Sequence, residues 1–499
     1  MRAAATVGWI LLAGLAAGST SCATNPATGK HEISLVSESQ EIQMGQQYAQ
    51  QVVKSMGVYD DKKVQDYVTR LGMAIATTSE RPQLPWAFYV MDDPTVNAFA
   101  LPGGSIFITR GILTHMNDEA ELVGVLGHEI GHVTARHSVQ QMTRQQIAQI
   151  GLGVGSILSS DVAQYAGLAS QGLGVLFLKY GRDAESQADM LGFKYMVREN
   201  YDPHAMAAMF TTLQRVSRLE GAGDIPEWES THPDPGNRIE ATMKRLDTLS
   251  VPASKLHYGR DEYLPILAGM TYGEDPRQGY IEGNTFYHPG LRFKLDLPTG
   301  WQAQNTPEAL AAVSPQQDAM FQLTATGRGA PDEAAKQFFG QEGIQSSDVK
   351  SSPVNGNPAV SGFFQAQTEQ GAVQGVVAFV KYGELTYRLL GYTPAGKLQA
   401  HEKTFRSTIG SFSELKDKAR LEVTPFQVAL VKVDREMTVA EFNEQHPSTI
   451  PVERVAVVNG LDTPADRITA GTTFKRIIGG VGAEVAQKKK APADTTASK

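Results

Sequence analysis

Two histidines and a glutamate stand at a spacing that suits a metal ion. His128, Glu129 and His132 belong to the run HEIGH, which lies in a segment whose apolar residues recur at helical spacing. Residues four apart share one helical face, so both imidazoles can reach one ion while Glu129 orients and deprotonates a water. With 11 His and 53 Asp+Glu in 499 residues, chance predicts on the order of 0.03 such motifs, so composition alone does not account for it.

A second acidic pair downstream supplies candidates for completing the site. A catalytic zinc ion takes three protein ligands and keeps one position open, so one more donor is needed. Glu185 is the candidate ligand, in the run ESQAD on another predicted helix, and Asp189 falls one turn further on the same face. There its carboxylate can accept the outer N–H of a ligating histidine. Such a pair is common on exposed helices, and only HEIGH upstream makes it a metal-site candidate.

HEIGH followed by ESQAD resembles the gluzincin zinc metallopeptidases of the HtpX and CAAX-prenyl-protease type. The start CATNPATGK is similar to that of their soluble periplasmic lipoprotein branch, which carries extra C-terminal modules. The run THPDPGNRI resembles a late motif of the family. The resemblance implies that His232 approaches the metal, to close the open position or to stabilise the oxyanion, and that Arg238 supports it. Read without the resemblance, both would be surface residues.

The run NAFALPGGSIFITRGIL resembles the strand pair beside the active site of that family. The resemblance implies an edge strand that binds the substrate backbone in extended form, through Asn97, Ala98, Phe99 and Ala100. An ordinary hairpin is the alternative. His137 follows His132 by five residues and would point about 140° away on a continuous helix, so we interpret it as structural, and we assign no role to His115.

The motifs together predict a zinc-dependent endopeptidase with one Zn²⁺ per chain and Glu129 as the general base. The resemblance implies polypeptide substrates, in particular misfolded or outer-membrane proteins, and the outer-membrane assembly machinery as a partner. Two alternatives stay open: an envelope chaperone or scaffold whose zinc site His232 keeps closed, and a peptidoglycan-anchored binding protein. A metal hydrolase with another substrate suits an extended-strand groove less well.

The first 22 residues predict export. A positive start is followed by an apolar run too short to span a bilayer, and then by small residues that lead into Cys22, the single cysteine. These features predict a signal peptide over 1–22 and a lipid anchor at Cys22, in the periplasm at the outer membrane. An ordinary secretory signal is the alternative. One cysteine excludes a disulfide framework, and 45 Lys+Arg against 53 Asp+Glu give no basic excess for a nucleic-acid partner.

Predicted helices and strands surround the motifs. Ser37 and Gln40 form a capping-box pattern that opens a helix to about Met56. A helix with one apolar face, strand-like runs from Trp86 to Thr109, and the HEIGH helix beginning at Asn117 follow. The glycine-rich segment 147–178 predicts buried helices or, alternatively, a lid or membrane-facing surface. Further helices are predicted over 183–200 and from Asp202-Pro203 onward.

The predicted fold class is α+β, in several domains. A mainly helical zincin-type metallopeptidase domain with a small sheet covers 23–264, and an α/β domain that resembles PsbP proteins covers 280–415. Residues 420–479 resemble a small LysM-like glycan-binding module, although Arg435 to Thr438 replace its usual Gly-Asp-Thr turn; a purely structural role is the alternative. Residues 480–499 have the composition of a disordered tail.

Overall fold

The computed structural model describes residues 21–152, 180–220, 228, 232, 235–249, 251–252, 255–307, 309–368 and 371–480. It contains two compact units. The first is made of Met1–Gly273 and Gln427–Ile478, and the second of Glu274–Phe426 and Gly479–Lys499. The predictions for residues 1–20, for most of the glycine-rich segment and for the tail after 480 lie outside the described residues.

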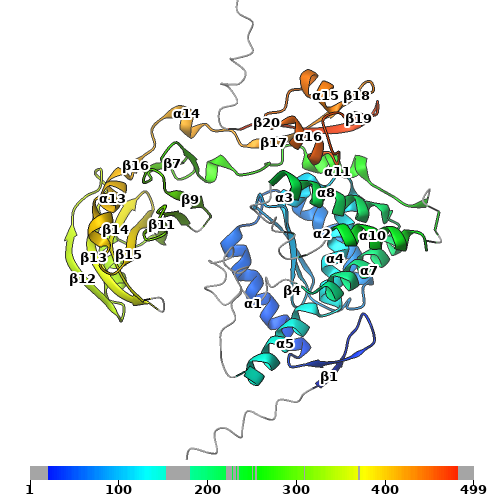
Figure 1. Ribbon diagram of the computed structural model, residues 1–499, viewed down its shortest axis with the longest axis horizontal. Coiled ribbons are helices and arrows are strands. Elements are labelled where there is room, and N and C mark those ends of the chain that lie inside the picture. The colour runs from blue at the N-terminus through cyan, green and yellow to red at the C-terminus, as the bar shows by residue number, and fades with distance from the viewer. Residues whose placement is uncertain are drawn as a thin grey trace, which may run out of the picture. The chain divides into compact units, whose positions relative to one another are not determined.

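The first unit is built mainly from helices. In chain order they are α1 (Glu38–Met56), α2 (Lys62–Thr78), α3 (Arg110–His115), α4 (Glu119–Thr134), α5 (His137–Leu152), α7 (Arg182–Arg198), α8 (His204–Glu220), α10 (Pro235–Leu246) and α11 (Arg260–Leu267). The capping box at Ser37 and Gln40 is confirmed. α4 packs against α7, α8 and α2 (Figure 1), and each of its residues is buried.

The start of α4 differs by one residue from the prediction. Asp118 is the N-cap, with a side chain that accepts a hydrogen bond from the Glu121 N–H. Asn117, which we expected there, instead donates from Nδ2 to the His115 carbonyl. Both residue types cap helices well, so their order along the chain does not decide between them.

A small sheet lies beside these helices. Its strands are β3 (Ala87–Met91), β5 (Ser105–Thr109) and β4 (Ala98–Leu101) in that spatial order, with β3 parallel and β4 antiparallel to β5. Gly103 and Gly104 make the predicted turn between β4 and β5 with φ of 81° and 108°, a region that glycine enters without steric cost. Among the described strands, β4 pairs only with β5 and so forms an edge of the sheet. A hairpin of β1 (Ser21–Thr24) and β2 (His31–Ser34) precedes α1.

The segment 427–478 belongs to the first unit. It contains β17 (Phe426–Lys432) paired with β20 (Thr473–Gly479), β18 (Met437–Thr438) paired with β19 (Arg467–Ile468), and the helices α15 (Val439–Gln445) and α16 (Val452–Val458). The segment has a small core of its own around Val439, Phe442 and Phe474. It is also bonded to the helices, because the fully buried Lys475 donates from Nζ to the carbonyls of Thr114 and Met116 at 2.9 and 2.7 Å. We predicted a separate module here, whereas the structure joins the segment to the helices of the first unit.

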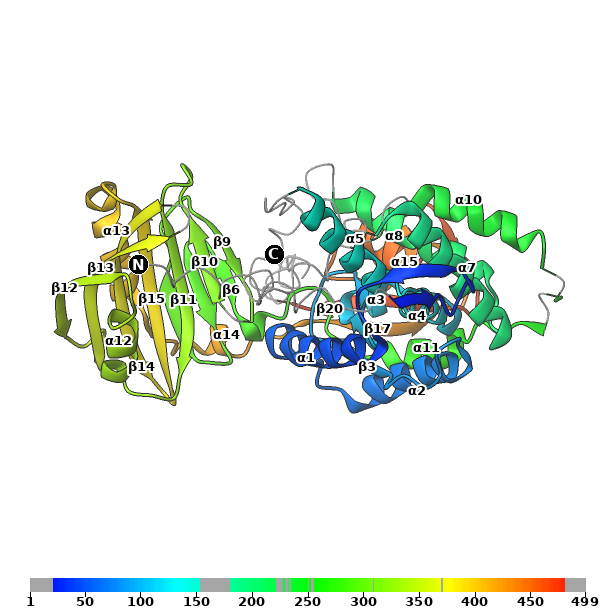
Figure 2. The same cartoon turned by 90° about the horizontal axis from the view of Figure 1, so that it is seen from below.

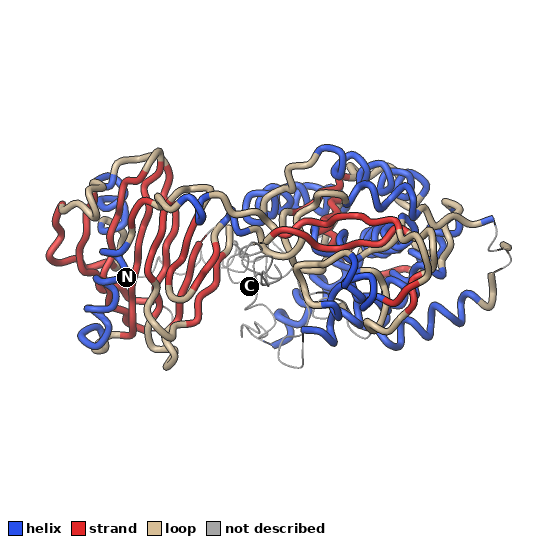
Figure 3. Tube along the Cα trace, turned by 90° about the horizontal axis from the view of Figure 1, so that it is seen from above, coloured by secondary structure: helices blue, strands red, loops and turns tan. Residues whose placement is uncertain are grey.

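The second unit is mostly sheet (Figure 3). Its seven-stranded sheet has the order β12 (Ile344–Ser351), β13 (Ala359–Thr368), β14 (Gly371–Tyr382), β15 (Leu385–Pro394), β11 (Met320–Gly327), β10 (Ala309–Val313), β9 (Gln302–Asn305). A smaller sheet has the order β16 (Ser413–Glu414), β8 (Phe293–Asp296), β7 (Thr285–His288), β6 (Tyr280–Glu282), and the helical segments are η4 (Pro276–Gln278), α12 (Pro331–Phe339), α13 (Leu398–Ser411) and α14 (Lys418–Leu421).

The large sheet of the second unit has a core on each face. Val376, Ala378 and their alternate neighbours pack with Phe405 of α13, whereas Val377 packs with Phe338 of α12, as the period of two in a strand requires (Figure 2). Its strand pairs are antiparallel. The unit is therefore α+β, and the predicted α/β label is corrected: the neighbouring strands of this sheet pair antiparallel, and α12 connects β11 to β12, which are not neighbours in the sheet.

The mixed α+β class is confirmed, with a helical first unit and a β-rich second one. Within the described residues, none of the helices combines the length and the apolar character that a membrane span requires.

Candidate metal centre

The metal centre depends on close contact between α4 and α7. A Cβ at Gly131 of α4 would lie 3.0 Å from the Ala188 carbonyl oxygen, and one at Gly127 would lie 3.1 Å from the Gly192 Cα. Only glycine fits without a shift at such distances, so the two helices approach along a glycine-lined face. This contact brings Glu185 of α7 up to the two histidines of α4.

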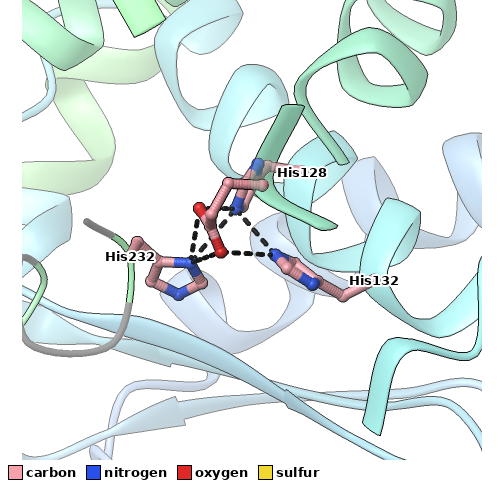
Figure 4. Close-up of side chains that lie close together, drawn as sticks. His128, His132 and His232 are labelled. Atoms are coloured by element: carbon pink, nitrogen blue, oxygen red, sulfur yellow. Dashed lines mark hydrogen bonds and ion pairs between the residues drawn. The ribbon is translucent and has the colours of Figure 1, made fainter. Parts of the chain in front are cut away.

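Four buried groups converge at this point. Their ligand atoms all lie within 4.8 Å of one another, and they belong to His128, His132, Glu185 and His232. The Nε2 atoms of His128 and His132 are 3.0 Å apart, and the Glu185 carboxylate is 3.5 Å from His128 Nε2 and 3.4 Å from His132 Nε2. Figure 4 shows the three imidazoles pointing toward one another. The structure thus brings the three predicted ligands together.

These separations fit zinc. Nitrogen and oxygen ligands at 2.0–2.2 Å from a tetrahedral ion lie roughly 3.3 to 3.6 Å from one another, close to the distances between the donors. Both carboxylate oxygens of Glu129 are buried and have no hydrogen-bond partner among the described residues. A buried carboxylate is costly to leave without a partner, and a water activated at the metal would supply one.

His232 completes a four-donor set. Its Nδ1 lies 3.1 Å from Glu185 Oε1 and 3.3 Å from His128 Nε2, and its Nε2 lies 3.6 Å from Glu129 Oε1. The Trp228 ring stacks on the His232 imidazole with centroids 4.2 Å apart. His232 therefore adds a fourth donor to the three predicted ligands.

Asp189 and Arg238 support the ligands from behind. Asp189 Oδ1 lies 2.9 Å from His128 Nδ1, as expected for a carboxylate that orients a ligating histidine. Arg238 on α10 donates to both oxygens of Asp189, at 2.9 and 2.6 Å, and its Nη1 lies 3.1 Å from Glu185 Oε2. The guanidinium is thus bound to the two carboxylates of α7, one turn apart, and supports the ligand set by fixing them.

Burial and charge set the protonation preferences of the centre. Burial lowers the pKa of the His128 imidazole to about 3, and the Arg238 charge adds to this effect, so the ring is neutral and able to bind a metal. Burial raises the pKa of Glu129 despite the nearby histidines. Burial also opposes ionisation of Glu185, but the charges of His232 and Arg238 outweigh it and hold its pKa well below the usual value. One carboxylate is therefore kept ionised for the metal, and the other accepts protons more readily.

The proposed substrate strand lies on β4 and just before it. The side chains of Asn97, Ala98, Phe99 and Ala100 are buried. Asn97 Oδ1 accepts the Ala98 N–H, and its Nδ2 has no hydrogen-bond partner among the described residues. A polypeptide bound at this strand would therefore meet its backbone edge and the Asn97 amide, and not exposed apolar side chains.

His137 does not lie where a continuous helix would place it. α4 ends at Thr134, and Arg136 takes a left-handed φ of 57°, so the chain turns and α5 begins at His137. The His137 Nδ1 lies 2.9 Å from His132 Nδ1. Our prediction that this ring points away is wrong, because it assumed that the helix continues.

Other neighbours of the ligands had no signal that we recognised in the sequence. Tyr180 stacks on His132 with centroids 4.1 Å apart, and its hydroxyl is 2.7 Å from Ser138 Oγ. Gln187 Oε1 is 2.8 Å from His137 Nε2. Gln187 lies inside ESQAD, between two residues that we selected, so its position two residues from each was the available clue. His115 contacts the Gly111 carbonyl through Nδ1 within α3 and serves no ligand.

An HExxH helix whose third ligand is a glutamate on another helix defines a gluzincin-type metallopeptidase. In agreement with this class, residues 62–246 match the Peptidase family M48 profile, so the chain carries an M48 peptidase domain and our prediction of its class is confirmed. The domains of this family are zinc-dependent metallopeptidases.

Named relatives match part of the chain. The beta-barrel assembly-enhancing protease of Escherichia coli K12 is 29% identical over 45% of this chain and 48% of its own length. The corresponding putative protease of Vibrio cholerae is 31% identical over 41% and 44%, and the mitochondrial metalloendopeptidase OMA1 of Schizosaccharomyces pombe is 34% identical over 37% and 54%. The matched segment thus spans about half the length of these relatives.

Solved structures match the chain less well. The cyanobacterial PsbP of Synechocystis sp. PCC 6803 aligns with 26% of this chain and 91% of its own, with 9% identity and a TM-score of 0.23. A likeness of this size does not assign a fold family.

Proposed function

We propose that the protein is a zinc-dependent endopeptidase that hydrolyses polypeptides of the bacterial envelope. The observation that carries the proposal is the buried set of four donors beside the Glu129 carboxylate, which accepts no hydrogen bond from the described residues. His128, His132 and Glu185 would hold the ion. When bound, zinc supplies Lewis acidity that lowers the pKa of water and polarises the scissile carbonyl.

The chain's own residues perform the proton transfers. Glu129 takes a proton from the attacking water and delivers it to the leaving amine, a role that its raised pKa favours. Asp189 keeps His128 oriented by accepting from Nδ1, and Arg238 keeps both carboxylates of α7 in place. The peptide bond is hydrolysed without a covalent intermediate. His232, whose Nε2 lies 3.6 Å from Glu129 Oε1, would donate to the oxyanion.

We propose an extended polypeptide as the substrate. β4 has a neighbour on one side only in the described sheet, and strand addition along that edge would supply main-chain hydrogen bonds without selecting a particular side chain. The residues Asn97 to Ala100 would bind the substrate backbone. This mode suits unfolded or misfolded chains, which expose their backbone.

A second function is supported by the position of His232. With its Nδ1 at 3.1 Å from Glu185, the imidazole fills the open ligand position, so the resting protein would turn over slowly and act as an envelope chaperone or scaffold. In either function, displacement of His232 controls activity.

The predicted surroundings extend the proposal. We place the protein in the periplasm, held at the outer membrane by a lipid on Cys22, with outer-membrane proteins or their assembly machinery among its partners. The names of the Escherichia coli and Vibrio cholerae relatives refer to beta-barrel assembly and support this setting. The PsbP-like reading of the second unit and glycan binding by the LysM-like segment remain proposals, and sedimentation with purified peptidoglycan tests the second of them.

Glu129→Gln tests the proposed mechanism. The amide keeps the shape of the side chain but cannot take a proton, so zinc should be retained at one ion per chain while cleavage of unfolded casein is lost, by a factor of about 100 or more. Zinc content and initial rate are measured on the same purified preparation.

Glu185→Ala is the matched comparison. It removes a ligand instead of the base, so both zinc content and cleavage should fall. Full activity in Glu129→Gln would reject Glu129 as the base, and full zinc content in Glu185→Ala would reject the ligand set.

A further inference from the structure

The Nδ1 atoms of the two histidine ligands contact different kinds of partner. His128 Nδ1 faces the Asp189 carboxylate at 2.9 Å. His132 Nδ1 faces another imidazole nitrogen, His137 Nδ1, also at 2.9 Å. We propose that His137 is a positioning residue for the metal centre, which fixes the tautomer and orientation of His132 by accepting its Nδ1–H; this inference rests on the proposed zinc site.

Gln187, the last residue in the series His132–His137–Gln187, determines which atom donates in each hydrogen bond. Gln187 Oε1 lies 2.8 Å from His137 Nε2 and, as an acceptor, requires a proton on that nitrogen. A neutral imidazole carries one N–H, so His137 Nδ1 is left with a lone pair and must accept. His132 then donates from Nδ1, and the lone pair of its Nε2 is directed at Glu185 and the other donors of the centre.

The turn after α4 holds His137 in this position. The left-handed conformation of Arg136, with φ of 57°, is unfavourable for a residue with a side chain. It is anchored on both sides, because Arg136 donates from Nε to Glu41 Oε2 at 2.9 Å and Asn25 Nδ2 donates to the Ala135 carbonyl at 3.0 Å. A surface turn without a role would not need this anchoring. His137 itself is buried.

α7 therefore reaches the centre through three of its residues. Glu185 is a ligand, Asp189 orients His128 directly, and Gln187 orients His132 through His137. Gln187 and Asp189 thus determine the tautomers of both histidine ligands, and both residues belong to α7.

The test is a zinc dissociation constant, measured by chelator competition on the purified full chain. His137→Phe keeps the ring but removes the acceptor, and zinc affinity should fall about 10- to 100-fold, as for other groups that orient metal ligands. His137→Gln restores an acceptor oxygen and should recover part of the loss. The absorption spectrum of the cobalt-substituted protein should shift in His137→Phe, because the ligand field changes with the orientation of His132.

The matched control is His115→Phe, a substitution of another buried histidine that serves no ligand. It should leave zinc affinity and the cobalt spectrum unchanged. Melting temperatures of the zinc-free proteins show whether each variant folds, and if His137→Phe does not fold, Gln187→Met carries the test with an expected smaller loss of affinity.

Three results would overturn the inference: unchanged zinc affinity and cobalt spectrum in His137→Phe, equal losses in His137→Phe and His137→Gln, or unchanged affinity in a Gln187→Met variant tested in their place. Failure of the proposed function looks different. In that case the unmodified protein itself would bind no stoichiometric zinc, or Glu129→Gln would remain active.

Discussion

At the scale of single residues, the proposed closure of the centre depends on one side chain, that of His232. His232 lies between Trp228, which stacks on it, and the ligands His128 and Glu185. Its removal takes one donor from the set but leaves the three that a catalytic zinc requires. Closure and catalysis are therefore separable by one substitution.

His232→Ala should raise the initial rate of casein cleavage several-fold at saturating zinc, since the position for water is then open, and should weaken zinc binding, since one donor is lost. His204→Ala, on an exposed histidine of α8 paired with Asp202, is the control and should leave both quantities unchanged. A slower His232→Ala enzyme would mean that His232 contributes more to the transition state than to closure.

The sequence predicted the residues whose relation is set by one helical period. HEIGH and ESQAD each lie within one or two helical turns, so their shared faces follow from local geometry. His232 and Arg238 were found only through family resemblance, because no periodicity relates residues of α4 to residues about a hundred positions later in the chain. His137 was placed wrongly, since the helix ends at Thr134 without glycine or proline, and a left-handed arginine is a conformation that the sequence does not announce.

At the scale of elements, the fit between α4 and α7 positions the third ligand. Gly131 lies inside HEIGH, so the motif contains both the chemistry and the contact surface that brings Glu185 near. The predicted helices and strands of this region agree with the structure because their patterns are local. Their packing was not predictable, because a glycine within a helix indicates only lower helix stability until the segment that packs against it is known.

Gly131→Ala tests this contact. The new Cβ would meet the Ala188 carbonyl oxygen at 3.0 Å and push α7 away, so zinc affinity should fall and the free energy of unfolding should drop by about 1–3 kcal/mol. Alanine inside a helix otherwise stabilises by about 1 kcal/mol relative to glycine, which makes a loss diagnostic. Gly181→Ala, at the start of α7 with open space around it, should change neither chelator-competition affinity nor urea unfolding. If Gly131→Ala bound zinc as tightly as the unmodified protein, the contact between α4 and α7 would accommodate the methyl group without moving Glu185.

At the scale of the whole molecule, the first unit is assembled from two distant parts of the chain. The second unit lies between them in the sequence, and the segment 427–478 returns to the peptidase helices. The sequence could not show this return, because the apolar positions of the segment satisfy a small core of its own, and nothing marks which of its polar residues is buried. Lys475 is that residue. Burial, followed by the Arg260 charge, lowers the pKa of its amino group well below the usual value, although the carboxylates of Asp118 and Glu121 at the start of the HEIGH helix oppose this shift.

Lys475→Met should therefore destabilise the peptidase unit as well as the segment that carries it. The substitution keeps most of the apolar stem but leaves the carbonyls of Thr114 and Met116 without their donor, at a cost of about 1–3 kcal/mol for each buried group. Urea unfolding, followed by the loss of bound zinc, should show a lower midpoint than in the unmodified protein. Lys432→Met replaces an exposed lysine of the same segment, and its free energy of unfolding should stay within about 0.5 kcal/mol of that of the unmodified protein.

If zinc release in Lys475→Met kept its original midpoint while the segment alone melted earlier, the segment would be an independent module, and its attachment would not contribute to the metal centre. A coincident shift instead makes residues 427–478 part of the peptidase fold, because the amino group of Lys475 in this segment donates to the carbonyls of Thr114 in α3 and of Met116 directly after it.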